Sequence, residues 1–167
     1  MDTLETAAGA LSPCGKKRPL SLKARAVQYL ARREYSRAEL RSKLRRYLLP
    51  QDDPGELERV LDELQEKNLL SETRYAESRV RTRSGRFGNA RLEYELRQLG
   101  VPAEAIAEAL EPFKENEAER ALALWRRRFS SPADTPKERA KQIRYLLARG
   151  FSFDTVQEVL RLAEELP

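Results

Sequence analysis

The chain has 167 residues, of which 40% are hydrophobic and 35% are charged, and its net charge is +5 at pH 7. It contains no histidine, which removes the usual partner of a serine or cysteine nucleophile and the commonest zinc ligand. Its single cysteine, Cys14, excludes an intramolecular disulfide framework. No apolar run approaches the roughly 20 residues that cross a bilayer, so we expect a cytoplasmic protein without a membrane partner.

Residues 1–20 carry early acidic residues and a Gly/Ser/Pro-containing stretch, and we expect them to form a disordered tail. Helical spacing of apolar residues follows directly and predicts a first three-helix repeat over residues 21–70. Ser36 followed by Glu39 predicts a capping box at the start of its second helix. Asp53, followed by a proline and then a glutamate, predicts the N-cap of its third helix.

A second three-helix repeat is predicted over residues 71–113, with Gly100 as the stop signal of its second helix. The glycine-flanked turn at residues 85–88 lacks the Gly-Lys-Ser/Thr ending of a phosphate-binding loop and follows a helical segment rather than a strand. A third repeat is predicted over residues 114–167, with another capping box at residues 135–138.

Apolar positions and a glycine recur between the second and third repeats with a shift of 50 residues. The matched positions are Leu96, Gly100, Val101, Ile106 and Leu110, which return as Leu146, Gly150, Phe151, Val156 and Leu160. Repeats of this kind bury their apolar faces partly against their neighbours. The predicted fold class is therefore all-α: three tandem three-helix, helix-turn-helix-like repeats that form an elongated, curved array.

Charge follows the same repeat, because the first two helices of each unit are basic and the third is acidic. The net basic segments are residues 21–50, 73–100 and 120–150, and the net acidic segments are residues 51–72, 101–119 and 151–167. One interpretation is a row of basic patches that steers association with an anionic partner. The other is internal salt bridging between neighbouring repeats, and the two are compatible.

Arginine outnumbers lysine 24 to 8. Because guanidinium binds phosphate and carboxylate in a bidentate way, this bias suits contact with DNA or with an acidic protein surface. A charge run is ordinarily a solvated helix face, but its recurrence in all three repeats favours a binding role. The candidate residues for binding a filament or DNA are Arg41, Lys43, Arg45, Arg46, Arg79, Arg81, Arg83, Arg86, Arg91, Arg126, Arg127, Arg128, Arg144 and Arg149.

For the aromatic residues, packing inside the protein is the preferred interpretation, ahead of contact with a partner. Phe87, in the glycine-flanked turn, is interpreted as a hydrophobic staple, with an exposed contact as the alternative. Trp125 is expected to pack between helices with its N–H near the surface. Core packing is also expected for the tyrosines at apolar helical positions, namely Tyr29, Tyr47, Tyr75, Tyr94 and Tyr145.

Three groups of residues resemble the motifs of the RecX family, in that family's order. They are residues 35–40; residues 74–77 with Arg79, Arg81, Arg83, Gly85, Gly88, residues 95–97 and residues 100–101; and residues 149–152 with Asp154, Val156 and Leu160. The resemblance covers roughly residues 21–162. Two positions depart from it: Asn89 stands where relatives often have proline, and Phe87 replaces a more polar turn residue.

The resemblance implies tandem three-helix modules that bind the RecA filament on single-stranded DNA. It implies inhibition of the ATPase, strand-exchange and coprotease activities of RecA, in homologous recombination, DNA repair and the SOS response. Binding to DNA itself, single-stranded and also double-stranded, is implied as well. The alternative is a helical DNA-binding protein that acts on DNA without RecA. In either case we expect a monomer with no enzymatic activity, no catalytic residue, no metal and no cofactor.

Overall fold

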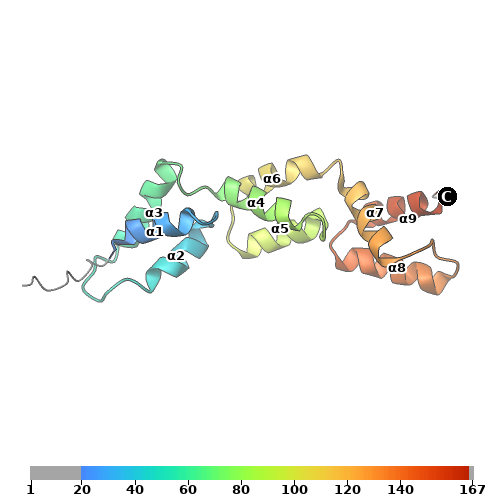
Figure 1. Cartoon of the computed structure of the whole chain (residues 1–167), viewed down its shortest axis with the longest axis horizontal. Helices are drawn as coiled ribbons and strands as arrows, with labels where there is room; N and C mark the ends of the chain where they lie inside the picture. Colours follow the sequence, from blue (N-terminus) through green and yellow to red (C-terminus); the bar gives the residue numbers. More distant parts are fainter. Residues whose placement is uncertain (1–19, 166–167) are drawn as a thin grey trace, which may run out of the picture.

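A computed structural model describes residues 20–165, and within this range the chain forms nine α-helices, one short 3-10 helix and no strand. The helices group in threes along the chain, and the groups follow one another along the longest axis of the molecule (Figure 1). We call these groups modules 1, 2 and 3. The arrangement confirms the predicted all-α fold built from tandem three-helix repeats.

Module 1 consists of α1 (Leu22–Leu30), α2 (Arg37–Arg45) and α3 (Glu56–Glu66). The hydroxyl oxygen of Ser36 accepts a hydrogen bond from the backbone N–H of Glu39 at 3.1 Å, as expected of an N-cap. Helix α3 begins differently, because its N-cap is Gly55. Asp53 instead accepts the N–H of Gly55 at 2.9 Å, in the local turn that aspartate forms with the backbone two residues ahead. The prediction that Asp53 is the N-cap is therefore wrong.

Module 2 consists of α4 (Glu72–Arg83), α5 (Asn89–Gln98) and α6 (Ala103–Leu110), followed by the 3-10 helix η1 (Glu111–Phe113). Gly100 ends α5 with φ +76°, in the left-handed region that glycine adopts without a Cβ clash. The N–H of Val101 then turns back to the carbonyl oxygen of Leu96 at 3.1 Å. Gly100 thus acts as the helix stop that the sequence predicts.

Module 3 consists of α7 (Glu117–Arg128), α8 (Pro136–Ala148) and α9 (Phe153–Glu164). Thr135 caps α8 by accepting the backbone N–H of Glu138 at 3.2 Å. Trp125 is only 2% exposed, and its indole N–H donates to Oε1 of Gln142 at 3.0 Å inside the module. The prediction of an N–H near the surface is wrong, because a second buried side chain supplies the acceptor that would otherwise be water.

Each module has its own hydrophobic core, formed where apolar residues at three- and four-residue spacing face the other two helices. On α5, for example, Leu92 and Leu96 point inward and are buried. Tyr94 lies midway between them in sequence and so faces the other side of the helix, where it is 63% exposed. The expectation of core packing is wrong for Tyr94, whereas Tyr75 is buried.

Among the helices of residues 20–165, none combines the length and the apolar character that a membrane crossing requires.

Candidate functional site

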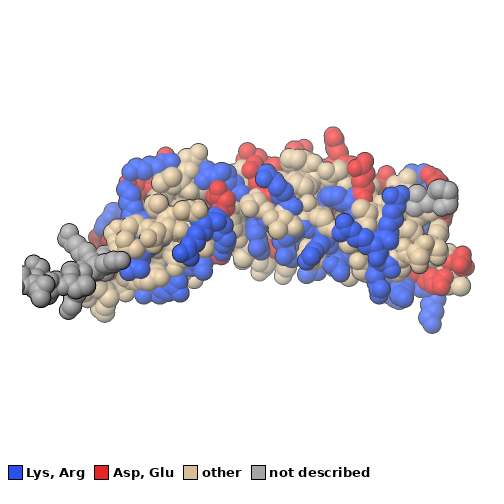
Figure 2. Space-filling view, viewed as in Figure 1, with Lys and Arg blue, Asp and Glu red and all other residues tan. Residues whose placement is uncertain are grey.

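Basic and acidic side chains are unevenly distributed on the face of the molecule seen in Figure 2. Lys and Arg run along the length of the face seen in Figure 2, whereas Asp and Glu gather along the upper edge of the middle of the molecule, where α6 lies. Part of this charge is neutralised inside modules, as in the ion pair of Arg41 with Glu58 at 2.6 Å and that of Arg139 with Glu164 at 2.8 Å. Internal salt bridging is thus present, and within residues 20–165 it lies mostly inside modules rather than between them.

In module 1, cations cover the faces of tyrosine rings. The Cζ atom of Arg33 lies 3.7 Å from the ring centroid of Tyr35, and Cζ of Arg25 lies 4.1 Å from that of Tyr47. The Nζ atom of Lys43 lies 5.8 Å from the Tyr35 ring. Contacts of this kind attract the cation to the electron-rich ring face and fix its position.

A hydrogen-bonded pair of tyrosines extends this group. The hydroxyl groups of Tyr29 and Tyr47 lie 3.2 Å apart, and Nη2 of Arg46 donates to the Tyr29 hydroxyl at 2.6 Å. The hydrogen bonds from Tyr47 and Arg46 lower the pKa of Tyr29 below its ordinary value. They also hold the Arg46 guanidinium beside the two rings.

Where modules 1 and 2 meet, three arginines and the carboxylates of Glu34 and Glu39 line a shallow hollow. Arg33 enters it from module 1, and Arg79 and Arg83 enter it from module 2. Arg33 is paired with Glu39 at 2.5 Å on the module 1 side. Arg79 makes no ion pair within residues 20–165, so its charge is available to an anion in the hollow.

Three guanidinium groups surround Phe87 at the junction of modules 2 and 3. The Cζ atoms of Arg83, Arg91 and Arg149 lie 4.6, 4.7 and 5.7 Å from the centroid of the ring. Glu95 accepts hydrogen bonds from Nη2 of Arg83 at 3.0 Å and Nε of Arg91 at 3.1 Å. Burial opposes ionisation of Glu95, but these two arginines outweigh it and lower the pKa of the carboxyl.

The same pattern continues through module 3. Arg149 also lies 5.3 Å from the ring centroid of Tyr145, which meets Phe129 edge to face at 5.4 Å. Arg128 follows at 6.0 Å from the Phe129 ring. A succession of ring-anchored cations and the hollow therefore links all three modules. We call it the cation strip, and its members are Arg25, Arg33, Lys43, Arg46, Arg79, Arg83, Arg91, Arg128 and Arg149.

The geometry suits the binding of anionic groups better than base stacking. The ring faces are already covered by the protein's own cations, and Tyr35 is only 6% exposed. A guanidinium that lies over a ring has lost conformational freedom before it binds a phosphate or carboxylate. Arg33, Arg83 and Arg91 already bond Glu39 or Glu95. Arg128 and Arg149 make no side-chain hydrogen bond within residues 20–165, so their N–H edges are free. Within residues 20–165, no group of three or more His, Cys, Asp or Glu side chains is arranged to hold a metal ion.

The structure places the sequence-predicted candidates in three settings. Arg41 faces α3 and is engaged by Glu58 through Nε and Nη2, at 2.6 and 2.9 Å. Those that lie in the cation strip are Lys43, Arg46, Arg79, Arg83, Arg91, Arg128 and Arg149. Those that are exposed and outside it are Arg45, Arg81, Arg86, Arg126, Arg127 and Arg144.

Sequence reasoning missed Arg25 and Arg33. Both belong to the basic segment 21–50, but neither lies in its densest group of charges. Arg33 is two residues from Tyr35, and this proximity was a usable signal. The contact of Arg25 with Tyr47 joins residues far apart in sequence, so it becomes visible only in the folded module.

Comparison with known proteins identifies the relatives of this chain. Residues 71–110 match the family model described as the second three-helix domain of RecX, and residues 115–160 match that of the third. "Regulatory protein RecX" of Leptothrix cholodnii is 51% identical over 145 residues, which cover 87% of this chain and 90% of the relative. The protein of the same name from Ralstonia pickettii is 47% identical over 151 residues, covering 90% and 92%.

Solved structures agree with this result. The crystal structure of RecX from Lactobacillus salivarius superposes with a TM-score of 0.76 at 22% identity, covering 87% of this chain and 96% of that one. A crystal structure of regulatory protein RecX gives a TM-score of 0.66 at 25% identity, covering 87% and 74%. The first of these likenesses concerns the fold, whereas the relatives cover most of the sequence and the family models cover just over half of it. By these matches the chain belongs to the RecX family of regulatory proteins.

Proposed function

We propose that this protein binds the RecA filament assembled on single-stranded DNA and restrains it, inhibiting RecA ATPase, strand exchange and coprotease activity. It acts by binding, as a cytoplasmic monomer without catalysis of its own. The name that its relatives carry, "Regulatory protein RecX", supports a regulatory role. The resemblance of residues 35–40, 74–101 and 149–160 to RecX motifs supports RecA as the target.

The observation that carries the proposal is the cation strip. It links all three modules, so the protein offers anion-binding groups along its long axis rather than in one pocket. A filament is an elongated partner that repeats its own acidic and phosphate groups. Several weak contacts made together would raise the affinity far above that of any one module.

The test is a titration of this protein into RecA hydrolysing ATP on a fixed amount of single-stranded DNA, at constant salt. Action on the filament predicts strong inhibition at well below one molecule per RecA protomer. It also predicts that added free single-stranded DNA relieves little of this inhibition once the filament has formed.

The same titration separates the second candidate, a DNA-binding protein that acts without RecA. Arginine-rich surfaces bind nucleic acid phosphates without a protein partner, so the cation strip suits this candidate as well. It predicts inhibition that rises only as free DNA is sequestered and that disappears when DNA is in excess. That outcome, or no inhibition at all, would refute action on the filament.

A further inference from the structure

The two junctions between modules repeat one arrangement. At the first, Oε1 of Glu72, the first residue of α4, accepts the backbone N–H of Arg37, the first residue of α2, at 2.6 Å. At the second, Oε1 of Glu117, the first residue of α7, accepts the N–H of Asn89, the first residue of α5, at 2.7 Å. A carboxylate at the N-terminus of a helix is a favourable partner for its free N–H groups. Modules 2 and 3 are thus each clamped, through the first residue of their first helix, to the start of the second helix of the module before them.

At the second junction the backbone at Gly88 also contacts the backbone at residues 149–150, so closely that neither glycine could carry a side chain. The N–H of Gly88 donates to the carbonyl oxygen of Arg149 at 2.9 Å. A Cβ atom at Gly88 would lie 2.2 Å from the carbonyl oxygen of Gly150, and one at Gly150 would lie 2.2 Å from Cβ of Arg91. Nη1 of Arg91 also donates to the carbonyl oxygen of Ala148 at 3.1 Å. Modules 2 and 3 are therefore in direct main-chain contact.

Arg120 fastens the same junction from module 3. Its Nη1 atom donates to the carbonyl oxygens of Ser84 and Phe87 at 2.8 and 3.2 Å. Its Nη2 atom donates to Oδ1 of Asn89 at 2.7 Å and to the carbonyl oxygen of Phe113 at 3.1 Å. The planar guanidinium, half-buried at this point, holds these groups in one fixed arrangement.

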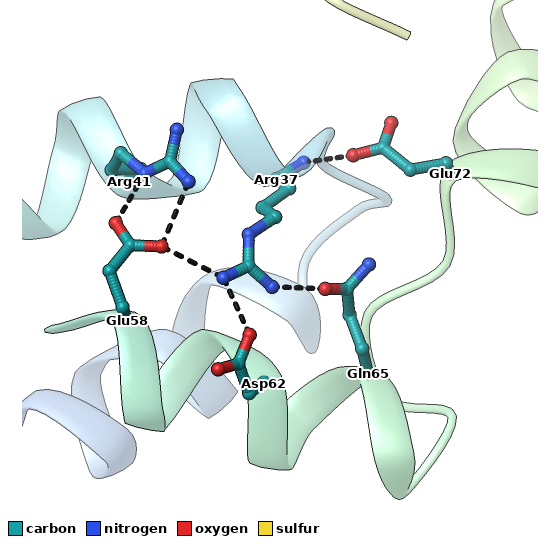
Figure 3. Close-up of polar contacts among 6 residues, drawn as sticks. All are labelled: Arg37, Arg41, Glu58, Asp62, Gln65 and Glu72. Carbon is teal, nitrogen blue, oxygen red and sulfur yellow. Dashed lines mark hydrogen bonds and ion pairs between the residues drawn. The ribbon is translucent and has the colours of Figure 1, made fainter. Parts of the chain in front are cut away.

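The first junction has no such main-chain contact, and its arginine, Arg74, bonds fewer groups than Arg120 does. A Cβ atom at Gly100, the counterpart of Gly150, would meet Cβ of Ala38 at 3.5 Å, an ordinary contact. Within residues 20–165, no backbone hydrogen bond joins modules 1 and 2. The polar contacts at this junction are the Glu72 clamp, visible in Figure 3 as it reaches from α4 to the start of α2, and those of Arg74. The Arg74 guanidinium pairs with Glu34 at 2.9 Å and donates to Oδ1 of Asn68 at 3.0 Å and to the carbonyl oxygen of Leu69 at 3.2 Å. Surface ion pairs of this kind contribute little free energy.

We propose that modules 2 and 3 form one rigid body and that module 1 swings against it about the linker at residues 67–71. Arg33 belongs to module 1, while Arg79 and Arg83 belong to module 2, so the swing changes the spacing of the cations that line the hollow. The cations around Phe87 keep their spacing, because the rigid junction lies among them. The cation strip then has one adjustable part and one fixed part. This inference rests on the junctions alone and is independent of the proposed function.

The test measures the distance distribution across each junction by pulsed electron spin resonance, in the protein alone and with Cys14→Ser as background. Spin labels are attached at exposed positions, one pair at Ser42→Cys and Ala107→Cys and another at Ala107→Cys and Glu158→Cys. We expect the distribution between modules 1 and 2 to be at least twice as wide as that between modules 2 and 3. Equal widths, or a wider second junction, would overturn the proposal.

The matched glutamates provide a second comparison. Glu72→Ala should widen the distribution across the first junction further, by about half or more, because the polar contacts that remain there are those of Arg74 alone. Glu117→Ala should leave the second distribution unchanged, because Gly88 and Arg120 still hold it. Helical circular dichroism verifies that both variants are folded. Equal widening by the two variants would mean that the junctions are alike, and the proposal would fall.

Discussion

At the scale of single residues, the buried hydrogen bond between Trp125 and Gln142 is the main polar contact in the interior of module 3. Both side chains are almost fully buried, and the amide of Gln142 is used at both ends: Oε1 accepts from the indole, and Nε2 donates to the carbonyl oxygen of Ser131 at 3.2 Å. A buried polar group is tolerated in a core only where it is paired in this way. The bond therefore specifies how α7, α8 and the loop between them fit together.

We predict that Gln142→Ala lowers the free energy of unfolding by about 1–3 kcal/mol, because the indole N–H is then buried without an acceptor. Trp125 is the only tryptophan of the chain, so its fluorescence reports unfolding in urea directly. The control is Gln98→Ala, which removes the same side chain from an exposed position at the end of α5. If the two variants were equally stable, the bond would contribute nothing measurable.

At the scale of helices, the basic face of α2 meets the acidic face of α3. Arg37 reaches Glu58 at 2.8 Å and Asp62 at 2.6 Å, and it also contacts Gln65 (Figure 3). Hydrogen bonds from Arg41 and then Arg37 lower the pKa of Glu58 to about 2. Within module 1, the alternation of basic and acidic helices in the sequence is thus partly explained by attraction between the neighbouring helices α2 and α3.

This attraction predicts a dependence of stability on pH. A carboxylate whose pKa is lower in the folded state stabilises that state above its unfolded pKa, and this contribution is lost as the pH falls from about 4.5 to about 2. Because Glu58 is partly exposed, solvent screening limits the contribution to about 1 kcal/mol. Glu58→Gln should therefore be less stable than the unmodified protein at pH 7 and about equally stable at pH 2.5. Urea unfolding at the two pH values measures this.

Glu104→Gln is the control for that experiment. Glu104 is exposed on α6 and makes no ion pair among the residues that the structure describes. Its substitution should change stability by only a few tenths of a kcal/mol at either pH. An equal loss from both glutamates at pH 7 would attribute the effect to overall charge rather than to the pairing of α2 with α3.

Several helix limits and caps could be predicted from sequence because their causes are local, although Asp53 is not the N-cap of α3. Ser36 and Gly100 act as expected because a cap depends on a few neighbouring residues. The close approach of Gly88 to Gly150 could not be predicted, since it depends on how two modules meet. Likewise, charge clustering identified Arg41 and Arg79 alike, yet α3 engages Arg41 and leaves Arg79 facing the hollow. Folding decides which charges remain available, and the sequence pattern alone does not.

At the scale of the whole molecule, the three modules differ in what they offer a partner. Module 1 carries cations over tyrosine rings, whereas modules 2 and 3 share the group around Phe87. A long partner must meet both parts at once, so the angle at the first junction controls how well they fit together. If the RecA filament is that partner, position along the cation strip should matter more than total charge.

We therefore predict that Arg79→Glu with Arg128→Glu raises the concentration needed to inhibit RecA ATPase at least tenfold, which corresponds to about 1.4 kcal/mol. Neither arginine has a carboxylate partner among residues 20–165, so no buried charge is left unpaired by the change. The control, Arg81→Glu with Arg127→Glu, alters the same two helices and the net charge equally, but at exposed positions outside the cation strip. Its inhibitory concentration should change less than threefold. Equal weakening by both pairs would show that the partner senses net charge, and the cation strip would lose its special role.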